Sequence, residues 1–399
     1  MFHAAHGYQK TPSPEAQEPG PAPEPGATHT ATALATAPAE RRTGRTSAPP
    51  APAGSTKPAG RDPYFDNAKY LAIVLVAVAH AWEPVMDGSR AARALYMIIY
   101  TFHMPAFILI SGYFSRSYQG KPHQIRRLLT GIALPYVVFE VAYSLFAKYA
   151  GGDSGQKITL LDPYYLTWFL AALFIWRLTT PLWRVVKWPL PIALAIAVAA
   201  ALTPGIGADL NLQRVLQFLP FFVLGLCMKP EHFRMLRRRE VKLLTLPLLA
   251  GTALFAYWLA PDITLRWFYR SSAVQDIGTE WWSGALIVLG FFGCAAVLTA
   301  AFLAWVPSRQ SWMTALGAGT ICGYLLHGFV VKACDYLGVF AENDWLSGPI
   351  GLVTITLVMA GVVTLLCTPP VRRLMRPVTE PDMAWAFRKE EPAKAGAAR

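Results

Sequence analysis

The chain has 399 residues, of which 54% are hydrophobic and only 15% are charged. The apolar residues come in long runs, as they do in membrane helices, which excludes an ordinary soluble protein. The formal net charge is +12 at pH 7. The basic residues lie in short segments between the apolar runs, where membrane topology is encoded. We therefore expect an all-α integral membrane protein and no nucleic-acid partner.

Residues 1–60 are rich in Pro, Ala and Thr and contain no apolar run that would serve as a signal peptide. Because such a segment cannot bury a hydrophobic core, we expect a disordered, cytoplasmic tail. Residues 61–370 hold the apolar runs and form the predicted membrane domain. Residues 371–399 are polar and basic and are expected to form a second cytoplasmic tail.

The membrane domain is predicted to be a bundle of about ten transmembrane helices, because a span needs roughly 20 mostly apolar residues. Pro105, Pro135 and Pro247 lie inside predicted spans, where kinks are expected. In chain order, the predicted spans are 67–86, 94–114, 127–147, 163–181, 188–204, 213–228, 242–260, 282–305, 315–333 and 347–368.

The distribution of charge between the loops predicts the orientation. If both termini lie on one side, the loops on that side carry more Lys and Arg than the opposite loops. The positive-inside rule then places both termini in the cytoplasm, so we expect a multi-pass protein of the cell membrane. The cluster of Arg237, Arg238 and Arg239 is expected to be a topology signal or a contact with anionic lipid.

The first predicted span carries an aligned stripe of ionisable residues. Lys69 and His80 are eleven residues apart. This spacing is about 20° past three full turns, so both residues share one helix face, roughly 16 Å apart along the axis. Asp66 and Glu83 lie within about 60° of that face. Ionisable groups in membrane helices usually face a bundle interior or a wet cavity, so the stripe indicates a site. The alternative is a snorkelling lysine and a histidine held in the bundle.

Three further ionisable residues lie at the predicted depth of His80. Counted from the cytoplasmic boundary, His80, His103, Glu140 and His327 all lie roughly 18–20 Å deep. We interpret them as a candidate reaction layer. Two structural alternatives stay open. His103 would bond a carbonyl freed by the kink at Pro105, and Glu140 would pair with a buried Arg or Tyr.

The cysteines lie in or beside apolar segments and form no CxxC pattern. We interpret them as small packing residues and predict neither a structural disulfide nor a thiol-bound metal. The layer of His and Glu supplies one residue per helix, so no ligand spacing supports a zinc site. We therefore predict no bound metal and no bound cofactor. The cysteines are Cys227, Cys294, Cys322, Cys334 and Cys367.

Five short elements follow one another along the chain in an order typical of a known family. The first is a basic residue, ten others and a His, here Lys69 and His80. The others are FHMPAFILISGYF, RRLLTGIALPY, YLTWFLAALF and LGAGTICGYLLH. In this pattern the chain resembles the membrane-bound acyltransferase-3 family over residues 61–370, especially the branch similar to fucose 4-O-acetylases. It departs from the family pattern at Lys69, where Arg is commoner, and at Thr320, where Ser is usual.

The resemblance implies transfer of an acyl group, with acetyl expected, from acyl-CoA as co-substrate to a hydroxyl. The acceptor is usually a sugar of a cell-surface glycan or of a small glycosylated metabolite. An alcohol is a poor nucleophile and needs a base within about 3 Å. His80 is the expected general base, with a covalent acyl-His relay as the alternative. Lys69, His327 and Glu140 complete the predicted catalytic set.

Coenzyme A carries several phosphate charges, which Arg and Lys bind well. The expected donor-binding residues lie at the cytoplasmic mouth of the second and third spans, where plain topology charge is the alternative. Ser111 and Gly112 would let the pantetheine arm approach the backbone, or would serve close helix packing. The donor set is Arg116, Lys121, Arg126 and Arg127, and the substrate-binding set is His103, Ser111, Gly112, Trp168 and Glu83. On the outer face, Trp267, Asp276, Glu280 and Trp281 are expected to contact a sugar.

A transporter or exporter of a glycan or a lipid-linked sugar is the alternative function. It would also have many spans, and its buried His and Glu would couple protons. No internal repeat is evident, which disfavours transporters built from two similar halves. A non-catalytic membrane scaffold is disfavoured by the ionisable stripe. The sequence does not indicate the oligomeric state.

Overall fold

The computed structural model describes residues 62–207 and 209–388. The predicted tail at residues 1–60 therefore lies outside the described residues. Within the described ranges the chain forms helices and turns and no β-strand, which confirms the all-α prediction.

The longer helices are connected by short turns and by single-turn helices. The long and medium helices are α1 (Pro63–Trp82), α2 (Arg90–Ser115), α4 (Leu134–Tyr149), α5 (Trp168–Leu178), α7 (Pro189–Ala201), α8 (Leu212–Cys227), α10 (Arg239–Leu259), α12 (Trp281–Trp305), α14 (Thr320–Tyr336), α15 (Pro349–Leu366) and α16 (Pro369–Thr379). The short ones are η1 (Met86–Gly88), α3 (Pro122–Leu128), η2 (Leu129–Ala133), α6 (Thr180–Val185), η3 (Asp209–Asn211), α9 (Pro230–Leu236), α11 (Arg266–Tyr269), η4 (Gln275–Ile277), α13 (Trp312–Leu316), η5 (Asp344–Ser347) and η6 (Ala384–Ala386).

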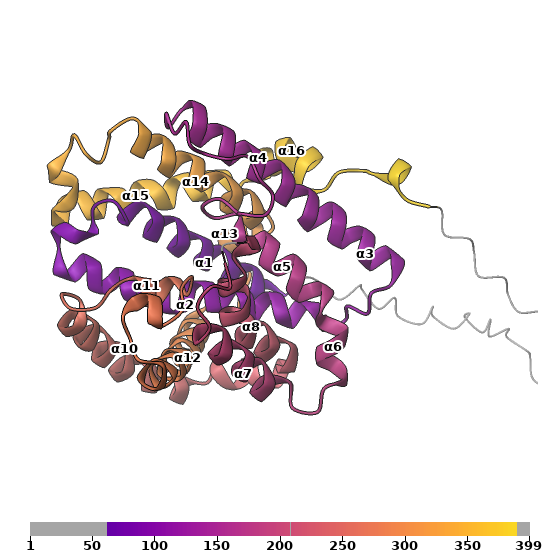
Figure 1. The fold of residues 1–399 in the computed structure, drawn as a ribbon, viewed down its shortest axis with the longest axis horizontal. Helices are drawn as coiled ribbons and strands as arrows, with labels where there is room; N and C mark the ends of the chain where they lie inside the picture. The colour runs from indigo at the N-terminus through magenta and orange to yellow at the C-terminus, as the bar shows by residue number, and fades with distance from the viewer. Residues whose placement is uncertain (1–61, 208, 389–399) are drawn as a thin grey trace, which may run out of the picture. The chain divides into compact units, whose positions relative to one another are not determined.

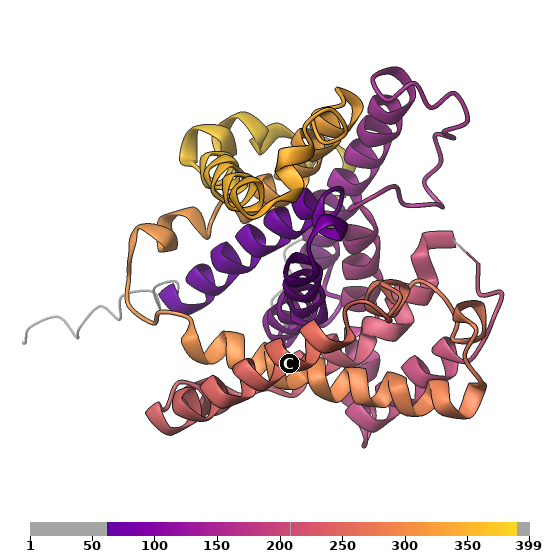
Figure 2. The ribbon, with the colours of Figure 1, turned by 90° about the vertical axis from the view of Figure 1, so that its left-hand side faces the viewer.

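Helix α1 lies among other helices rather than at an edge of the bundle. It begins with a capped turn: the Asp62 carboxylate accepts a hydrogen bond from the Tyr64 N–H at 3.0 Å, and Pro63 occupies the first helical position. The helix packs against α2, α13, α14 and α15. In Figures 1 and 2 it runs between α14 and α15 on one side and α10 and α12 on the other. Its ionisable stripe is therefore enclosed by protein.

Helices α2 and α8 approach each other backbone to backbone. A Cβ built at Gly112 would lie 2.1 Å from the carbonyl oxygen of Phe222, and one at Gly225 would lie 2.1 Å from that of Leu109. Only residues without a Cβ allow such a crossing. Of the two explanations given for Gly112, the structure favours close helix packing, because the backbone of α8 lies directly against this residue.

Six helical segments in the described residues are long and apolar enough to cross a membrane, fewer than the ten predicted spans. The expected spans at 163–181 and 188–204 contain α5 and α7, with 11 and 13 helical residues. The span at 315–333 contains α14, with 17 residues. Helix α1 has 20 residues, but its polar stripe makes it less apolar than a lipid-facing span. The six segments are Arg90–Ser115, Pro122–Tyr149, Asp209–Cys227, Arg239–Leu259, Trp281–Trp305 and Pro349–Leu366.

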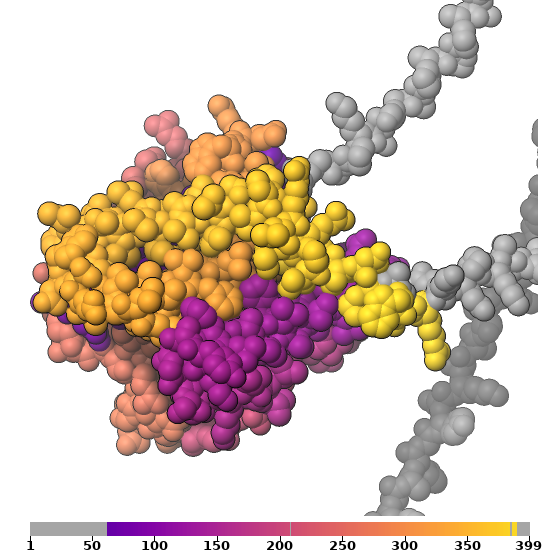
Figure 3. Space-filling model, turned by 90° about the horizontal axis from the view of Figure 1, so that it is seen from above, coloured from indigo at the N-terminus to yellow at the C-terminus, as the bar shows by residue number. Residues whose placement is uncertain are grey.

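The predicted boundary at residue 370 falls inside α16. This helix carries Arg372, Arg373 and Arg376. It packs against α4, α14 and α15. Figure 3 shows the C-terminal helices, orange to yellow, covering one face of the described chain beside α4. The membrane domain and the basic segment after it are thus in contact.

Candidate active site

Two cavities lie along α1, one toward each end of the helix. The first, called the His80 cavity, has a volume of about 260 Å³, and the second, called the Lys69 cavity, has a volume of about 570 Å³. The predicted stripe on α1 therefore faces two chambers. The His80 cavity is lined by His80, Glu83, Tyr100, His103, Met104, Pro163, Tyr165, Trp168, Arg214, Phe218, Phe268 and Tyr269. The Lys69 cavity is lined by Asp62, Phe65, Asp66, Lys69, Phe107, Ile110, Ser111, Phe114 and Arg177.

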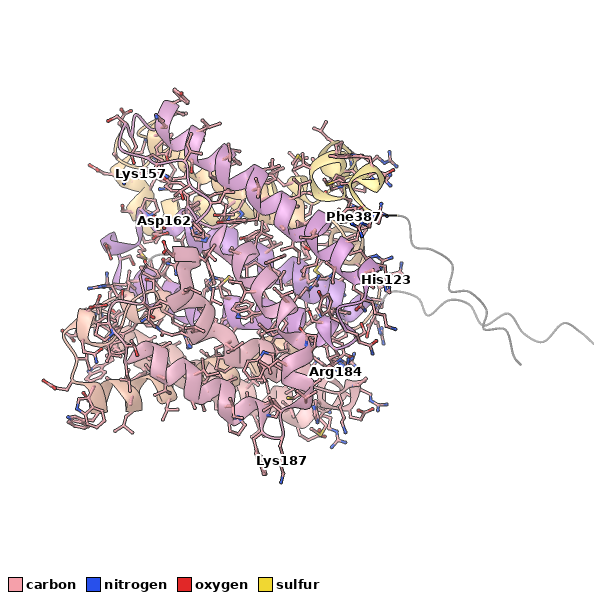
Figure 4. The ribbon with its side chains drawn as sticks, turned by 45° about the vertical axis from the view of Figure 1, so that its right-hand side comes forward. His123, Lys157, Asp162, Arg184, Lys187 and Phe387 are labelled. Carbon is pink, nitrogen blue, oxygen red and sulfur yellow. The ribbon has the colours of Figure 1, made fainter. Side chains whose placement is uncertain are left out.

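The loops at the two ends of these helices lie on opposite sides. Figure 4 shows His123, Arg184 and Lys187 on one side of the described chain and Lys157 and Asp162 on the other. Helices α2 and α5, which line the Lys69 cavity, lead into the short helices α3 and α6, which carry His123 and Arg184. Pro163, which lines the His80 cavity, follows the loop of Lys157 and Asp162. Each cavity is thus nearer a different side.

His80 is oriented by groups around its Nδ1 atom. Nδ1 lies 3.6 Å from Glu83 Oε2, one turn later on the chain, and 3.4 Å from the Tyr100 hydroxyl. The other oxygen of Glu83 accepts a hydrogen bond from the Tyr269 hydroxyl at 3.4 Å. A carboxylate only accepts, so it favours the tautomer in which Nδ1 carries the proton. That tautomer leaves Nε2 unprotonated and able to take a proton.

Tyr269, which supports Glu83, lies in α11, outside the long apolar helices. Burial raises the pKa of Tyr269 to about 12. Its hydroxyl therefore keeps its proton at neutral pH and donates to Glu83. The pair of Glu83 and Tyr269 forms the outer wall of the His80 cavity, where the Glu83 side chain is 40% exposed.

His103 and His327 each use Nδ1 to bond a backbone carbonyl, which leaves Nε2 as the nitrogen without a proton. His103 Nδ1 donates to the Ile99 carbonyl at 2.8 Å, and His327 Nδ1 donates to the Gly323 carbonyl at 3.0 Å. The carbonyl that Pro105 frees belongs to Thr101, so the alternative explanation of His103 does not apply. His103 lines the His80 cavity.

His327 lies close behind His80. The centres of the two imidazole rings are 5.6 Å apart. The His327 ring is fully buried, and its Nε2 atom has no hydrogen-bond partner among the described residues. Its position agrees with the predicted layer, although it does not line the cavity itself.

Glu140 does not face the His80 cavity, in contrast to the predicted layer. Its carboxylate accepts hydrogen bonds from the Tyr164 N–H at 2.9 Å, from the Ser144 hydroxyl at 3.3 Å and from the Thr167 hydroxyl. These bonds fix the segment that leads into α5. Glu140 therefore has the structural role that was given as the alternative. Its partners are hydroxyl groups and a backbone N–H in place of a buried Arg.

Two of the four predicted donor residues, Arg116 and Arg126, contact other protein groups. The Arg116 guanidinium donates to the carbonyls of Tyr113 and Met228, both at 2.9 Å, and lies 3.7 Å from the centre of the Tyr113 ring. Lys121 is exposed at the start of α3. Arg126 faces Asp382 at 3.8 Å. Arg127 alone lines a small pocket, which shares Arg177 with the Lys69 cavity.

Lys69 and Ser111 do face the larger cavity, as predicted. Lys69 Nζ lies 2.7 Å from Asp66 Oδ1 on the same helix face. Arg177, which the sequence reasoning did not single out, adds a second cation, and its Nε donates to Ser115 Oγ at 3.2 Å. Because it lies at the end of an apolar helix, it had been counted only as a topology charge.

Four polar residues that line the His80 cavity were not predicted: Tyr100, Tyr165, Arg214 and Tyr269. Tyr165 has a φ of 54°, which a residue with a side chain rarely adopts. Its ring centre lies 5.1 Å from that of His80. Such strain is typical of functional sites, but no sequence pattern marks it. Trp168, which was predicted, lines the same cavity.

The four residues predicted to contact a sugar on the outer face do not line the His80 cavity. Trp267 instead stacks on Phe291 beside a separate apolar cavity. In the described ranges, no three His, Cys, Asp or Glu side chains cluster as a metal ion would require. All five cysteines are free, and Cys322 and Cys367 are buried between helices.

The geometry brings His80, a second imidazole from His103 and the guanidinium of Arg214 to one cavity, and the two cations Lys69 and Arg177 to another. Comparison with known proteins assigns a family to this arrangement. The family model described as an acyltransferase domain, of the acyltransferase-3 type, matches residues 62–368. The nodulation protein NolL of Sinorhizobium fredii is 26% identical over 328 residues, covering 74% of this chain and 85% of that protein. No solved structure was found to match. The chain therefore belongs to the acyltransferase-3 family and is a membrane-bound acyltransferase.

Proposed function

We propose that this protein transfers an acyl group, of acetyl size, from acyl-CoA to a hydroxyl of a sugar, a cell-surface glycan or a glycosylated metabolite. It would act in the cell membrane with both termini in the cytoplasm. The observation that carries the proposal is the pair of cavities along α1, one containing His80 with Glu83, the other containing Lys69 with Arg177.

His80 is the proposed general base. Its Nε2 takes the proton of the acceptor hydroxyl as the oxygen attacks the thioester carbonyl. The tetrahedral intermediate then collapses, the C–S bond breaks, and the sulfur of CoA leaves with the proton held by His80. Glu83, at 3.6 Å from Nδ1, stabilises the imidazolium formed between these steps.

The Lys69 cavity is the proposed donor site. Lys69 and Arg177 supply positive charge for the phosphates of CoA, and Ser111 lies on the same wall. The cavity lies toward the short helices of His123 and Arg184. The distribution of loop charge predicts that this side is cytoplasmic. We keep Arg127 as a donor-binding residue. We do not keep Arg116, Lys121 and Arg126, because they face other partners or solvent.

The test is acyl transfer by the full chain in sealed vesicles, with radiolabelled acetyl-CoA on one side only. Replacing His80 by Ala is expected to lower transfer by roughly a hundredfold or more, the contribution of a general base. His123→Ala is the matched control, because His123 is exposed on α3 and lies outside both cavities. Full transfer by His80→Ala would overturn the assignment of the base. Movement of a glycan across the membrane without acylation would establish the transporter instead.

A further inference from the structure

The His80 cavity contains a positive charge that the proposed reaction does not use. Arg214 lies in the first turn of α8, and its Nε donates to the Tyr269 carbonyl at 3.2 Å. Its guanidinium carbon lies 5.2 Å from the centre of the Trp168 ring. In the part of the chain that the structure describes, no protein acceptor bonds its two terminal nitrogens and no carboxylate pairs with it. Those nitrogens are available to a ligand in the cavity.

Glu83 lines the same cavity but forms no ion pair with Arg214 in the described part of the chain. Tyr269 contacts both residues but through opposite ends: its hydroxyl donates to Glu83, and its main-chain carbonyl accepts from Arg214. The Glu83 carboxylate is already engaged by His80 and Tyr269. The carboxylate therefore serves His80 and Tyr269, and the terminal nitrogens of the guanidinium stay free of it.

The guanidinium is also held rigid before any ligand arrives. Trp168 lies beneath it and stacks in turn on Phe218, with ring centres 5.6 Å apart. A partly buried guanidinium whose terminal nitrogens bond no protein acceptor is costly, and an anion from the ligand would relieve that cost. The planar fork of Arg fits a carboxylate or a phosphate through two parallel hydrogen bonds.

We propose that Arg214 binds an anionic group of the acceptor, a carboxylate or a phosphate, while His80 takes the proton of its hydroxyl. This inference rests on the proposed function. The proposed ligand of Arg214 is not a phosphate of the acyl donor, because the proposed donor site is the other cavity, toward the opposite end of α1. The acceptor class would be sugar acids or phosphorylated sugars rather than neutral sugars.

The first test needs no variant. Binding of methyl β-D-glucuronide, glucose 6-phosphate and methyl β-D-glucoside to the purified full chain is measured by calorimetry without an acyl donor. A charge-assisted pair predicts that the anionic sugars bind roughly ten- to hundredfold more tightly than the glucoside. The order of the two anions distinguishes carboxylate from phosphate. Equal binding of all three, or no binding of either anion, would overturn the proposal.

Variants then assign the effect to Arg214. Arg214→Gln is expected to remove the advantage of the anionic sugars, and Arg214→Lys to keep part of it. Arg266→Gln is the matched control, because Arg266 on nearby α11 bonds the Asp276 carbonyl and Ser272 Oγ and lies outside the cavity. If Arg214→Gln weakens anionic and neutral sugars equally, or raises only the KM for acetyl-CoA, the proposal is wrong. The loss of transfer in His80→Ala is a separate readout, so failure of the proposed function can be distinguished from failure of this inference.

Discussion

Replacing Gly112 by Ala would distinguish helix packing from substrate binding at this position. The new Cβ would lie 2.1 Å from the Phe222 carbonyl oxygen and 3.2 Å from the Gly225 Cα. Because the obstacle is the backbone of α8, no side-chain rotation relieves it, and the helices must separate by about 1 Å to restore an ordinary C···O contact. Such overpacking costs about 3 kcal/mol, and the better helix propensity of Ala returns about 1 kcal/mol. The expected net loss of stability is about 2 kcal/mol.

The measurement is the thermal unfolding of the purified protein in detergent, together with the KM for acetyl-CoA. Gly251→Ala in α10 is the control, because a Cβ there meets nothing within 4 Å. That variant is expected to melt at or above the wild-type temperature, because the helix propensity of Ala raises the free energy of unfolding by up to about 1 kcal/mol. Gly112→Ala is expected to melt lower with an unchanged KM. The packing argument would be refuted by a Gly112→Ala protein that melts like the wild type but has a raised KM.

Two further predictions concern the cavities. Glu83→Gln is expected to lower kcat about tenfold with an unchanged KM for acetyl-CoA. The reason is that a charge pair at 3.6 Å is worth about 1.2 kcal/mol at the dielectric constant of water, which is the appropriate limit for a 40% exposed carboxylate. A kcat within twofold of wild type in steady-state assays would contradict the positioning role. Arg177→Gln is expected to raise the KM for acetyl-CoA roughly tenfold, the value of one charge-assisted hydrogen bond, whereas Arg126→Gln leaves it unchanged. A larger effect of Arg126→Gln would restore the loop arginines as the donor site.

The ionisable stripe of the first helix was predicted correctly because it depends on helix periodicity alone. Lys69 and His80 are too far apart in sequence to contact each other, but the helix repeat of 3.6 residues per turn places them on the same face. The enclosure of that face also followed from the sequence, since charged groups are costly against lipid. The division of the enclosed space into two cavities did not follow, because it depends on which side chains α2 and α5 place against α1.

Glu140 shows what depth along a helix leaves undetermined. Counting residues from a boundary gives the height of a side chain but not the direction in which its helix is turned. His80, His103 and His327 share the predicted height, and their directions bring them together: the ring centre of His80 lies 5.6 Å from that of His327, and His80 and His103 line one cavity. Glu140 shares only the height, because α4 turns it toward the segment before α5, where the Tyr164 N–H needs an acceptor. That segment has no regular periodicity, so neither the bond nor the left-handed Tyr165 could be anticipated.

The two arginines that the sequence reasoning passed over show the opposite error. Arg177 and Arg214 lie at the ends of apolar helices, where a cation is ordinarily explained by membrane topology. Their contacts separate them from the loop arginines: each uses one donor on a protein oxygen and presents the rest of its guanidinium to a cavity. Arg116 also lies at a helix end, but its guanidinium donates hydrogen bonds to two backbone carbonyls. A topology signal needs only charge, so a guanidinium held by protein contacts beside a cavity indicates binding rather than orientation.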